Sequence, residues 1–147
     1  MTSIRYQHTQ VGTVILSVVG FAAVGLASLI ATQDISWLVG GPVLGLLALT
    51  LTIFYALTVE VTPTTVRWYF GWGVWSKEIP LAALRKVEPV TYPWYYGYGI
   101  RYTPEGWLYN VSGTQAVKLV LRNGTPLLVG TDDPEGLVRA VRRHANL

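Results

Sequence analysis

Two long apolar segments near the start of the chain constrain its fold more than any other feature. They cover Val11–Ala31 and Leu38–Val59, and only the short stretch Thr32–Trp37 separates them. Neither segment contains a charged side chain. A helix of about 20 apolar residues rises about 1.5 Å per residue and can cross a hydrocarbon core of about 30 Å. The sequence therefore predicts an antiparallel transmembrane hairpin.

A cleaved signal peptide is the alternative interpretation of the first segment. Signal peptides use an apolar run of about 7–15 residues followed by a small-residue cleavage site. The run from Val11 to Ala31 is longer, and a second apolar segment follows it. These features favour the hairpin.

The distribution of Lys and Arg predicts the orientation of the hairpin. Arg5 precedes the first segment, every other basic residue lies at or after Arg67, and the connecting stretch contains only Asp34. Basic residues near a membrane are retained on the cytoplasmic side, so we expect a multi-pass protein of the inner (plasma) membrane with both termini cytoplasmic. Trp37 and Tyr55 are then placed at the two membrane–water interfaces.

Small residues recur in both apolar segments and let helix backbones approach closely in lipid. They favour packing of the two helices on each other, and they leave open a homo-oligomer formed through the same faces. The residues concerned are Gly12, Gly20, Ala22, Ala23, Gly25, Ala27, Gly40, Gly41 and Gly45.

The chain divides into residues 1–58, comprising an N-terminal tail and the hairpin, and residues 59–147, a cytoplasmic domain. Met1–Gln10 is short and polar, and we expect it to be the frayed start of the first helix. About ninety residues remain for the second part, enough for one small domain. The chain has no cysteine, which excludes disulfides and thiolate chemistry and is compatible with a cytosolic domain.

Alternating and β-branched residues predict a mostly β domain. In Thr65–Phe70, for example, Val66, Trp68 and Phe70 share one face, which indicates a half-buried strand. Leu119 and Leu121 are expected to face the interior in the same way, and Asn123-Gly124 predicts a type I′ hairpin turn. The predicted strands are Leu57–Thr62, Thr65–Phe70, Val74–Ile79, Arg85–Thr91, Gly99–Thr103, Trp107–Val111, Ala116–Arg122 and Pro126–Gly130.

An amphipathic helix is predicted at the end of the sequence. Asp133 is the expected N-cap and Pro134 the first helical residue. Leu137, Val138 and Val141 form an apolar stripe, while the arginines that follow face away from it.

Several short motifs in the second part resemble the bacterial pleckstrin-homology-like (PH-like) domain family, in the membrane-anchored form with an N-terminal two-helix transmembrane hairpin. The resemblance covers Leu57–Leu147 and implies a small barrel or sandwich with a C-terminal capping helix. Pleckstrin-homology domains bind phosphoinositides, peptides or proteins, but the bacterial relatives share no single ligand, so the resemblance implies none. The motifs are Lys77–Leu81, Gly97–Arg101, Gly113–Leu121, Asn123-Gly124 and Gly130–Pro134.

The sequence contains no recognisable catalytic or cofactor motif. His8 and His144 lie near opposite ends of the chain, which disfavours a catalytic triad or a two-histidine metal site. Gly97-x-Gly99 lacks the third glycine and the following helix of a dinucleotide site. Basic residues are too sparse for a nucleic-acid-binding module. We therefore predict no catalytic residue, no metal, no cofactor and no nucleic acid partner.

Two groups of residues are candidates for contact with the membrane or a partner. The first is Trp94, Tyr95 and Tyr96 in the aromatic stretch Tyr92–Tyr98, for which packing against the domain is the structural alternative. The second group is basic and has a solvated helix face as its alternative; it comprises Arg85, Lys86, Arg139, Arg142 and Arg143.

The sequence thus predicts a membrane-anchored interaction or scaffold module, not an enzyme. The bilayer is one partner, and a protein partner or homo-oligomer is left open. The alternative is an accessory subunit of a membrane enzyme or transporter without a catalytic site of its own. Intramembrane charge would favour a transport role, and neither apolar segment contains any.

Overall fold

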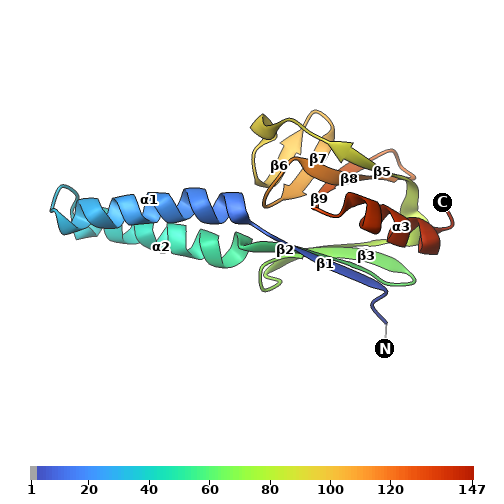
Figure 1. The fold of residues 1–147 in the computed structure, drawn as a ribbon, viewed down its shortest axis with the longest axis horizontal. Helices are drawn as coiled ribbons and strands as arrows, with labels where there is room; N and C mark the ends of the chain where they lie inside the picture. Colours follow the sequence, from blue (N-terminus) through green and yellow to red (C-terminus); the bar gives the residue numbers. More distant parts are fainter. Residues whose placement is uncertain (1–2) are drawn as a thin grey trace.

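The computed structural model describes residues 3–147, in which a pair of long helices projects from one end of a β-rich domain (Figure 1). The helices are α1, Thr13–Ala31, and α2, Trp37–Phe54. Both are long and apolar enough to cross a membrane, and very little of either is buried inside the protein. At about 1.5 Å per residue, each is about 28 Å long.

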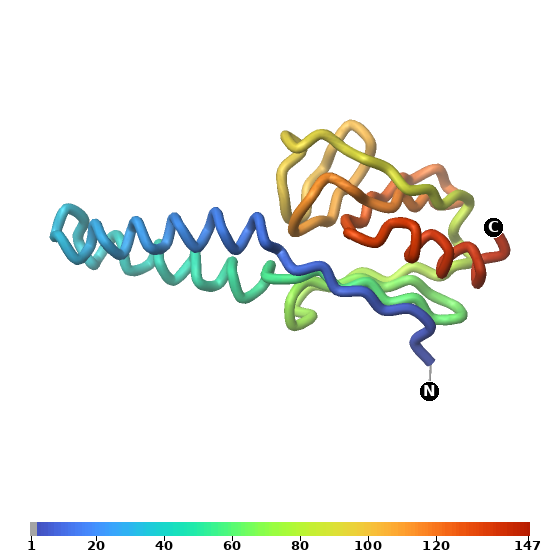
Figure 2. Tube along the Cα trace, in the orientation of Figure 1, coloured from blue at the N-terminus to red at the C-terminus, as the bar shows by residue number. Residues whose placement is uncertain are grey.

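The hairpin interrupts a β-ladder, which the sequence did not reveal. Strand β1, Tyr6–Val11, precedes α1 and pairs antiparallel with β2, Ala56–Val61, which follows α2. Val11 lies opposite Ala56 and Tyr6 opposite Val61, so the chain leaves the sheet through the helices and returns beside the strand it left (Figure 2).

Two boundary predictions are therefore wrong. The tail before the first helix is a strand from Tyr6 onward, and not the frayed start of a helix; Met1 and Thr2 lie outside the described residues. The second helix ends at Phe54, because Ala56–Val61 hydrogen-bonds in the sheet. A buried strand and the end of a membrane span have the same apolar composition, which explains the error.

The domain consists of two sheets and a C-terminal helix. The first sheet is antiparallel and has the order β1-β2-β3-β4, where β3 is Thr65–Phe70 and β4 is Trp75–Pro80. The second has the order β5-β8-β9-β7-β6. Its strands are β5 Leu84–Thr91, β6 Gly99–Thr103, β7 Gly106–Asn110, β8 Gln115–Leu121 and β9 Pro126–Gly130. Every predicted strand is present, but the parallel pairing of β7 with β9 was not predicted.

Single-turn 3₁₀ helices occupy two of the connections. They are η1, Leu81–Ala83, and η2, Trp94–Tyr96. The last helix, α3, is Pro134–Ala145 and packs on the second sheet.

The main core lies between the two sheets and α3. Trp68 and Leu119 are almost completely buried, as predicted, and Leu121 packs against the same cluster while partly exposed. The Trp68 and Tyr109 rings meet edge to face with centroids 5.4 Å apart, which joins the two sheets. From α3, Leu137 and its apolar neighbours complete this core.

The Asn123-Gly124 turn joins β8 to β9 as predicted but is not of type I′. Only Gly124 has a positive φ, +89°, and its N–H donates to the carbonyl of Leu121 at 2.9 Å. This is a longer loop in which a residue in left-handed conformation follows an ordinary turn.

Only some of the small residues lie where the two helices contact each other. Gly40 faces Ile30, where a Cβ atom would lie 2.5 Å from the Ile30 side chain, so this glycine lets the helices meet near their connection. Gly20, Gly25 and Gly45 have no such neighbour. Self-packing is therefore confirmed for Gly40 and not for these three glycines.

Because β1 and β2 are in register, the hairpin should be replaceable by a tight turn. We expect a chain in which Asn-Gly replaces residues 13–54, joining Gly12 to Tyr55, to be soluble and to unfold cooperatively. Gly12 N–H already donates to the Tyr55 carbonyl at 2.7 Å, which is the geometry of a closing ladder. Near-ultraviolet circular dichroism during denaturation would measure the cooperativity of unfolding. A matched chain of residues 61–147 lacks β1 and nearly all of β2 and should not fold; equal cooperativity of the two would contradict the strand assignment.

Candidate functional site

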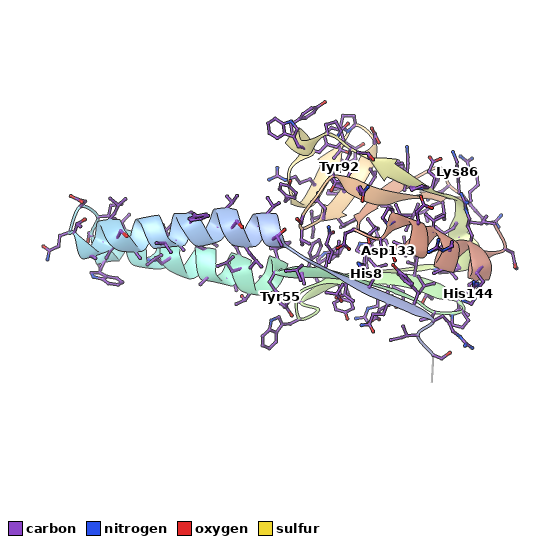
Figure 3. All side chains as sticks on the ribbon, in the orientation of Figure 1. His8, Tyr55, Lys86, Tyr92, Asp133 and His144 are labelled. Carbon is purple, nitrogen blue, oxygen red and sulfur yellow. The ribbon has the colours of Figure 1, made fainter. Side chains whose placement is uncertain are left out.

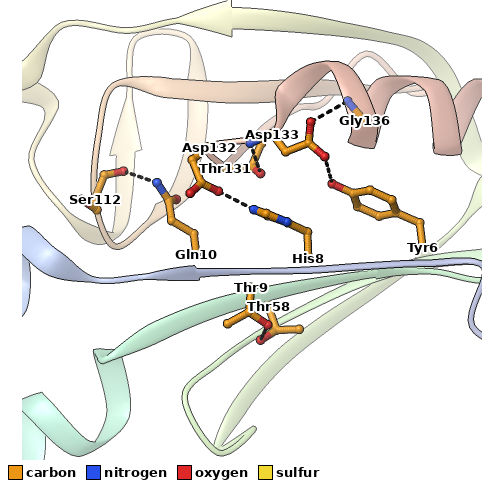
Figure 4. Close-up of polar contacts among 10 residues, drawn as sticks. All are labelled: Tyr6, His8, Thr9, Gln10, Thr58, Ser112, Thr131, Asp132, Asp133 and Gly136. Atoms are coloured by element: carbon orange, nitrogen blue, oxygen red, sulfur yellow. Dashed lines mark hydrogen bonds and ion pairs between the residues drawn. The ribbon is translucent and has the colours of Figure 1, made fainter.

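Polar contacts fasten β1 to the start of α3 (Figure 4). The Tyr6 hydroxyl donates to Oδ2 of Asp133 at 2.9 Å, and Oδ1 of Asp133 accepts from the Gly136 N–H at 3.0 Å. The N-cap prediction for Asp133 is therefore confirmed. The Tyr6 hydrogen bond, together with that of the Gly136 N–H, lowers the pKa of the Asp133 carboxyl, and burial and the same carboxylate raise the pKa of Tyr6.

Two further residues of β1 extend this fastening. His8 Nε2 pairs with the Asp132 carboxylate, and Gln10 Nε2 donates to the Ser112 carbonyl at 3.3 Å. Each of these residues bonds to the β9–α3 junction or to the loop before β8, so their evident role is to hold β1. Within residues 3–147, no group of three His, Asp or Glu side chains is arranged to hold a metal ion.

The aromatic stretch Tyr92–Tyr98 divides into a buried half and an exposed half. Tyr92 is buried, accepts from Asn110 Nδ2 at 2.6 Å and donates to the Gly113 carbonyl at 3.1 Å. Burial raises its pKa to about 12. The Tyr96 ring stacks on Tyr92, so the packing interpretation holds for these two residues. Trp94 and Tyr95 are 75% and 68% exposed, so they remain candidates for contact with the membrane or a partner.

A second exposed apolar pair lies beside the base of the hairpin and was missed by the sequence analysis. Trp72 and Val74, in the turn between β3 and β4, are 81% and 74% exposed. Gly71 binds this turn to the chain after α2, because its N–H donates to the Ala56 carbonyl at 2.8 Å. The available signal was the pair of large apolar residues in a Gly-x-Gly turn, where polar residues are usual.

The two helices leave the domain at one end, which we call the junction end. The Trp72 turn lies there, beside the backbone of Ile53 and the ring of Tyr55. The segment around Trp94 lies at the same end on the other side of the helices (Figure 1). The junction end therefore presents exposed aromatic side chains on two sides of the hairpin.

The predicted basic residues gather at the other end of the domain, which we call the basic end. Lys86 and His144 lie there, far from the hairpin (Figure 3). Arg142 donates to the Val87 carbonyl at 2.9 Å, and Lys86 pairs with Glu88 at 2.8 Å, which lowers the pKa of the Glu88 carboxyl. Three adjoining hollows along and beyond α3 bring the basic side chains together: Arg5, Arg85, Lys86, Arg122, Arg139, Arg142, Arg143 and His144.

The two predicted groups of contact residues therefore do not form one surface. Trp94, Tyr95 and the newly found Trp72 belong to the junction end, whereas Arg85, Lys86, Arg139, Arg142 and Arg143 belong to the basic end.

Comparison of the chain with family models, curated proteins and solved structures finds no match.

The Asp133 contacts make the stability of the domain depend on pH. A pKa that is lowered in the folded state stabilises the fold above the ordinary carboxyl pKa of about 4 and ceases to do so as the pH falls below that value. We expect Asp133→Ala to cost about 1–2 kcal/mol near neutral pH through loss of the cap. Asp133→Asn, which keeps a capping oxygen, should cost less and should reduce the loss of stability on acidification.

Denaturation of the full chain in detergent micelles at about pH 7 and about pH 3 would measure these differences. If Asp133→Asn had the same pH dependence as the unaltered chain, the titration would belong to other carboxyl groups.

Proposed function

We propose that the chain is a membrane-anchored interaction module, with the hairpin inserted as two spans and both termini in the cytoplasm. Exposed apolar helices and the absence of basic residues between them support the insertion and its direction. The observation that carries the proposal is the pairing of β1 with β2 across the base of the hairpin. This pairing gives the domain a fixed orientation relative to the helices.

The orientation assigns the junction end to the lipid headgroups. Tyr and Trp favour the membrane interface, where an apolar ring and a polar tip are both accommodated. Trp72, Trp94 and Tyr95 project at this end with most of their surface exposed. The resemblance to PH-like domains agrees with the two mostly antiparallel sheets and the C-terminal helix, with the hairpin carried between the first two strands.

The basic end then serves a cytoplasmic partner and not the leaflet. Arg5 is separated from α1 by β1 and Gly12, and the six residues of β1, at about 3.4 Å each, alone place it about 20 Å from the helix. The Debye length at physiological ionic strength is about 8 Å, so the leaflet attracts such charges weakly. Of the two contacts left open for the basic residues, the membrane or a partner, we therefore propose a protein partner with an acidic segment.

The composition of the basic end supports this choice of partner. Arg139 and Arg143 line one hollow with Arg5, and they make no side-chain hydrogen bond within the described residues. Guanidinium groups bind carboxylates with two parallel hydrogen bonds. The three hollows adjoin one another, so an extended acidic peptide could contact several cations at once.

Cysteine labelling tests the insertion, because the natural chain contains no cysteine. We expect Ser36→Cys, between the helices, to react with a membrane-impermeant maleimide added to whole cells. Ser76→Cys, on β4, should react only after the cells are opened. The reverse pattern would place the domain outside, and labelling of neither site in intact or opened cells would contradict the exposure of both residues.

Site-specific photocrosslinking tests the partner surface. A photoreactive residue at Asn146, beside the hollows, should crosslink the full-length protein to a partner in cells. Arg139→Gln with Arg143→Gln should reduce the adduct about tenfold or more, since two charge-assisted contacts are lost. Arg67→Gln with Lys77→Gln removes the same charge from β3 and β4 of the first sheet and should leave the adduct unchanged. Equal loss in both pairs, or loss in neither, would refute the assignment of the partner to the basic end.

A further inference from the structure

A cleft lies at the junction end, between the hairpin and the second sheet, and shares no residue with the three hollows of the basic end. Its volume is about 570 Å³, within the range of small-molecule sites. The helices provide an apolar wall and the segment before and within β6 provides the opposite lip. The lining comprises Val14, Ile15, Val18, Val19, Thr50, Phe54 and residues 97–101.

The cleft lies at one level along the helices. Val14 and Ile15 belong to the first turn of α1, and Phe54 is the last residue of α2. Val18, one turn further along α1, is 64% exposed. In the proposed orientation this level is the boundary between headgroups and hydrocarbon, and the cleft is open to the surface that faces the lipid tails.

Arg101 supplies a cation at the lip of this otherwise apolar cleft. Its Nε donates to the Tyr98 carbonyl at 2.9 Å, which fixes the guanidinium close to the backbone. Gly97 permits this position, since a Cβ atom there would lie 2.8 Å from Arg101 Nε. The terminal amino groups of Arg101 make no hydrogen bond to any other residue that the structure describes, so they can bind a ligand.

The lip is held in place from within the domain. Asn110 is completely buried and its Nδ2 donates to the Gly97 carbonyl at 3.0 Å as well as to the Tyr92 hydroxyl. The buried half of the aromatic stretch thus positions the segment that carries Arg101. A site fixed before binding loses less entropy when its ligand arrives.

We propose that this cleft binds one membrane phospholipid, with its phosphate on Arg101 and the first part of an acyl chain against Val14, Val18 and Phe54. An anionic phosphate matches the two free amino groups of a guanidinium. Hydrocarbon matches the helix wall. The inference rests on the insertion proposed above, and it adds a lipid site that the partner surface at the basic end does not require.

Other occupants fit only part of the cleft. An apolar helix of a partner protein would cover the wall but would leave the Arg101 charge without a partner, which is costly in an apolar contact. Free phosphate would pair with Arg101 but would leave the apolar wall in contact with water. A phospholipid satisfies both halves.

Native mass spectrometry of the full-length protein in detergent tests the proposal. We expect one phosphatidylglycerol to bind per chain, with diacylglycerol of the same acyl chains binding about tenfold or more weakly. Arg101→Gln should weaken phosphatidylglycerol binding by a similar factor. Val18→Phe, which fills the cleft, should weaken both lipids. Inorganic phosphate at millimolar concentration should not displace the lipid.

Matched variants separate the site from general effects. Arg67→Gln removes a cation outside the cleft, and Val24→Phe enlarges an equally exposed valine of α1 beyond it; both should bind as the unaltered chain does. Equal binding by Arg101→Gln and Arg67→Gln, displacement by phosphate, or equal binding of the two lipids would overturn the proposal. Ser36 and Ser76 labelling tests the insertion separately, so loss of lipid selectivity with correct labelling refutes the lipid site alone.

Discussion

The antiparallel pairing of β1 with β2 is the interaction on which the rest of the structure depends. Both helix ends meet at this ladder, where Gly12 N–H donates to the Tyr55 carbonyl and Val11 faces Ala56. A Cβ atom at position 12 would lie 2.8 Å from the Phe54 carbonyl, so only glycine allows this approach. The hairpin is thus attached at two adjacent points of one sheet, and a rotation of the helices must also rotate the domain.

Local patterns predicted most of the domain, and the failures involve partners distant in sequence. Trp68 and Leu119 were placed correctly because alternation is a property of each strand alone. The strand Tyr6–Val11 has few apolar residues, and its partner lies beyond both helices, so no local signal indicated it. The parallel contact of β7 with β9 has the same cause: pairing between strands that are not neighbours in sequence leaves no periodicity in either.

Residue type alone suggested the candidate contact residues, and it could not indicate where in the domain they lie. The sequence shows which residues are aromatic or basic. The directions of β1 and α3 in the fold determine at which end of the domain these side chains are exposed. Tyr92 was indistinguishable from Trp94 before the Asn110 hydrogen bond showed which is buried. The position of Trp72 beside the hairpin was not predictable, because the neighbouring Gly71 approaches the backbone at the end of α2 only in the folded chain.

The interrupted ladder also imposes an order on synthesis. β1 leaves the ribosome first, but its hydrogen-bonding edge has no partner until both helices and then Ala56–Val61 have been made. Pairing two strands that are separated by a long segment costs conformational entropy. The two adjacent helices reduce that cost, because they bring the end of β1 close to the start of β2. If only one helix enters the bilayer, β1 and β2 are left on opposite sides of the membrane and the first sheet cannot form. With the proposed insertion, the first sheet therefore forms only in a chain whose two helices both cross the bilayer.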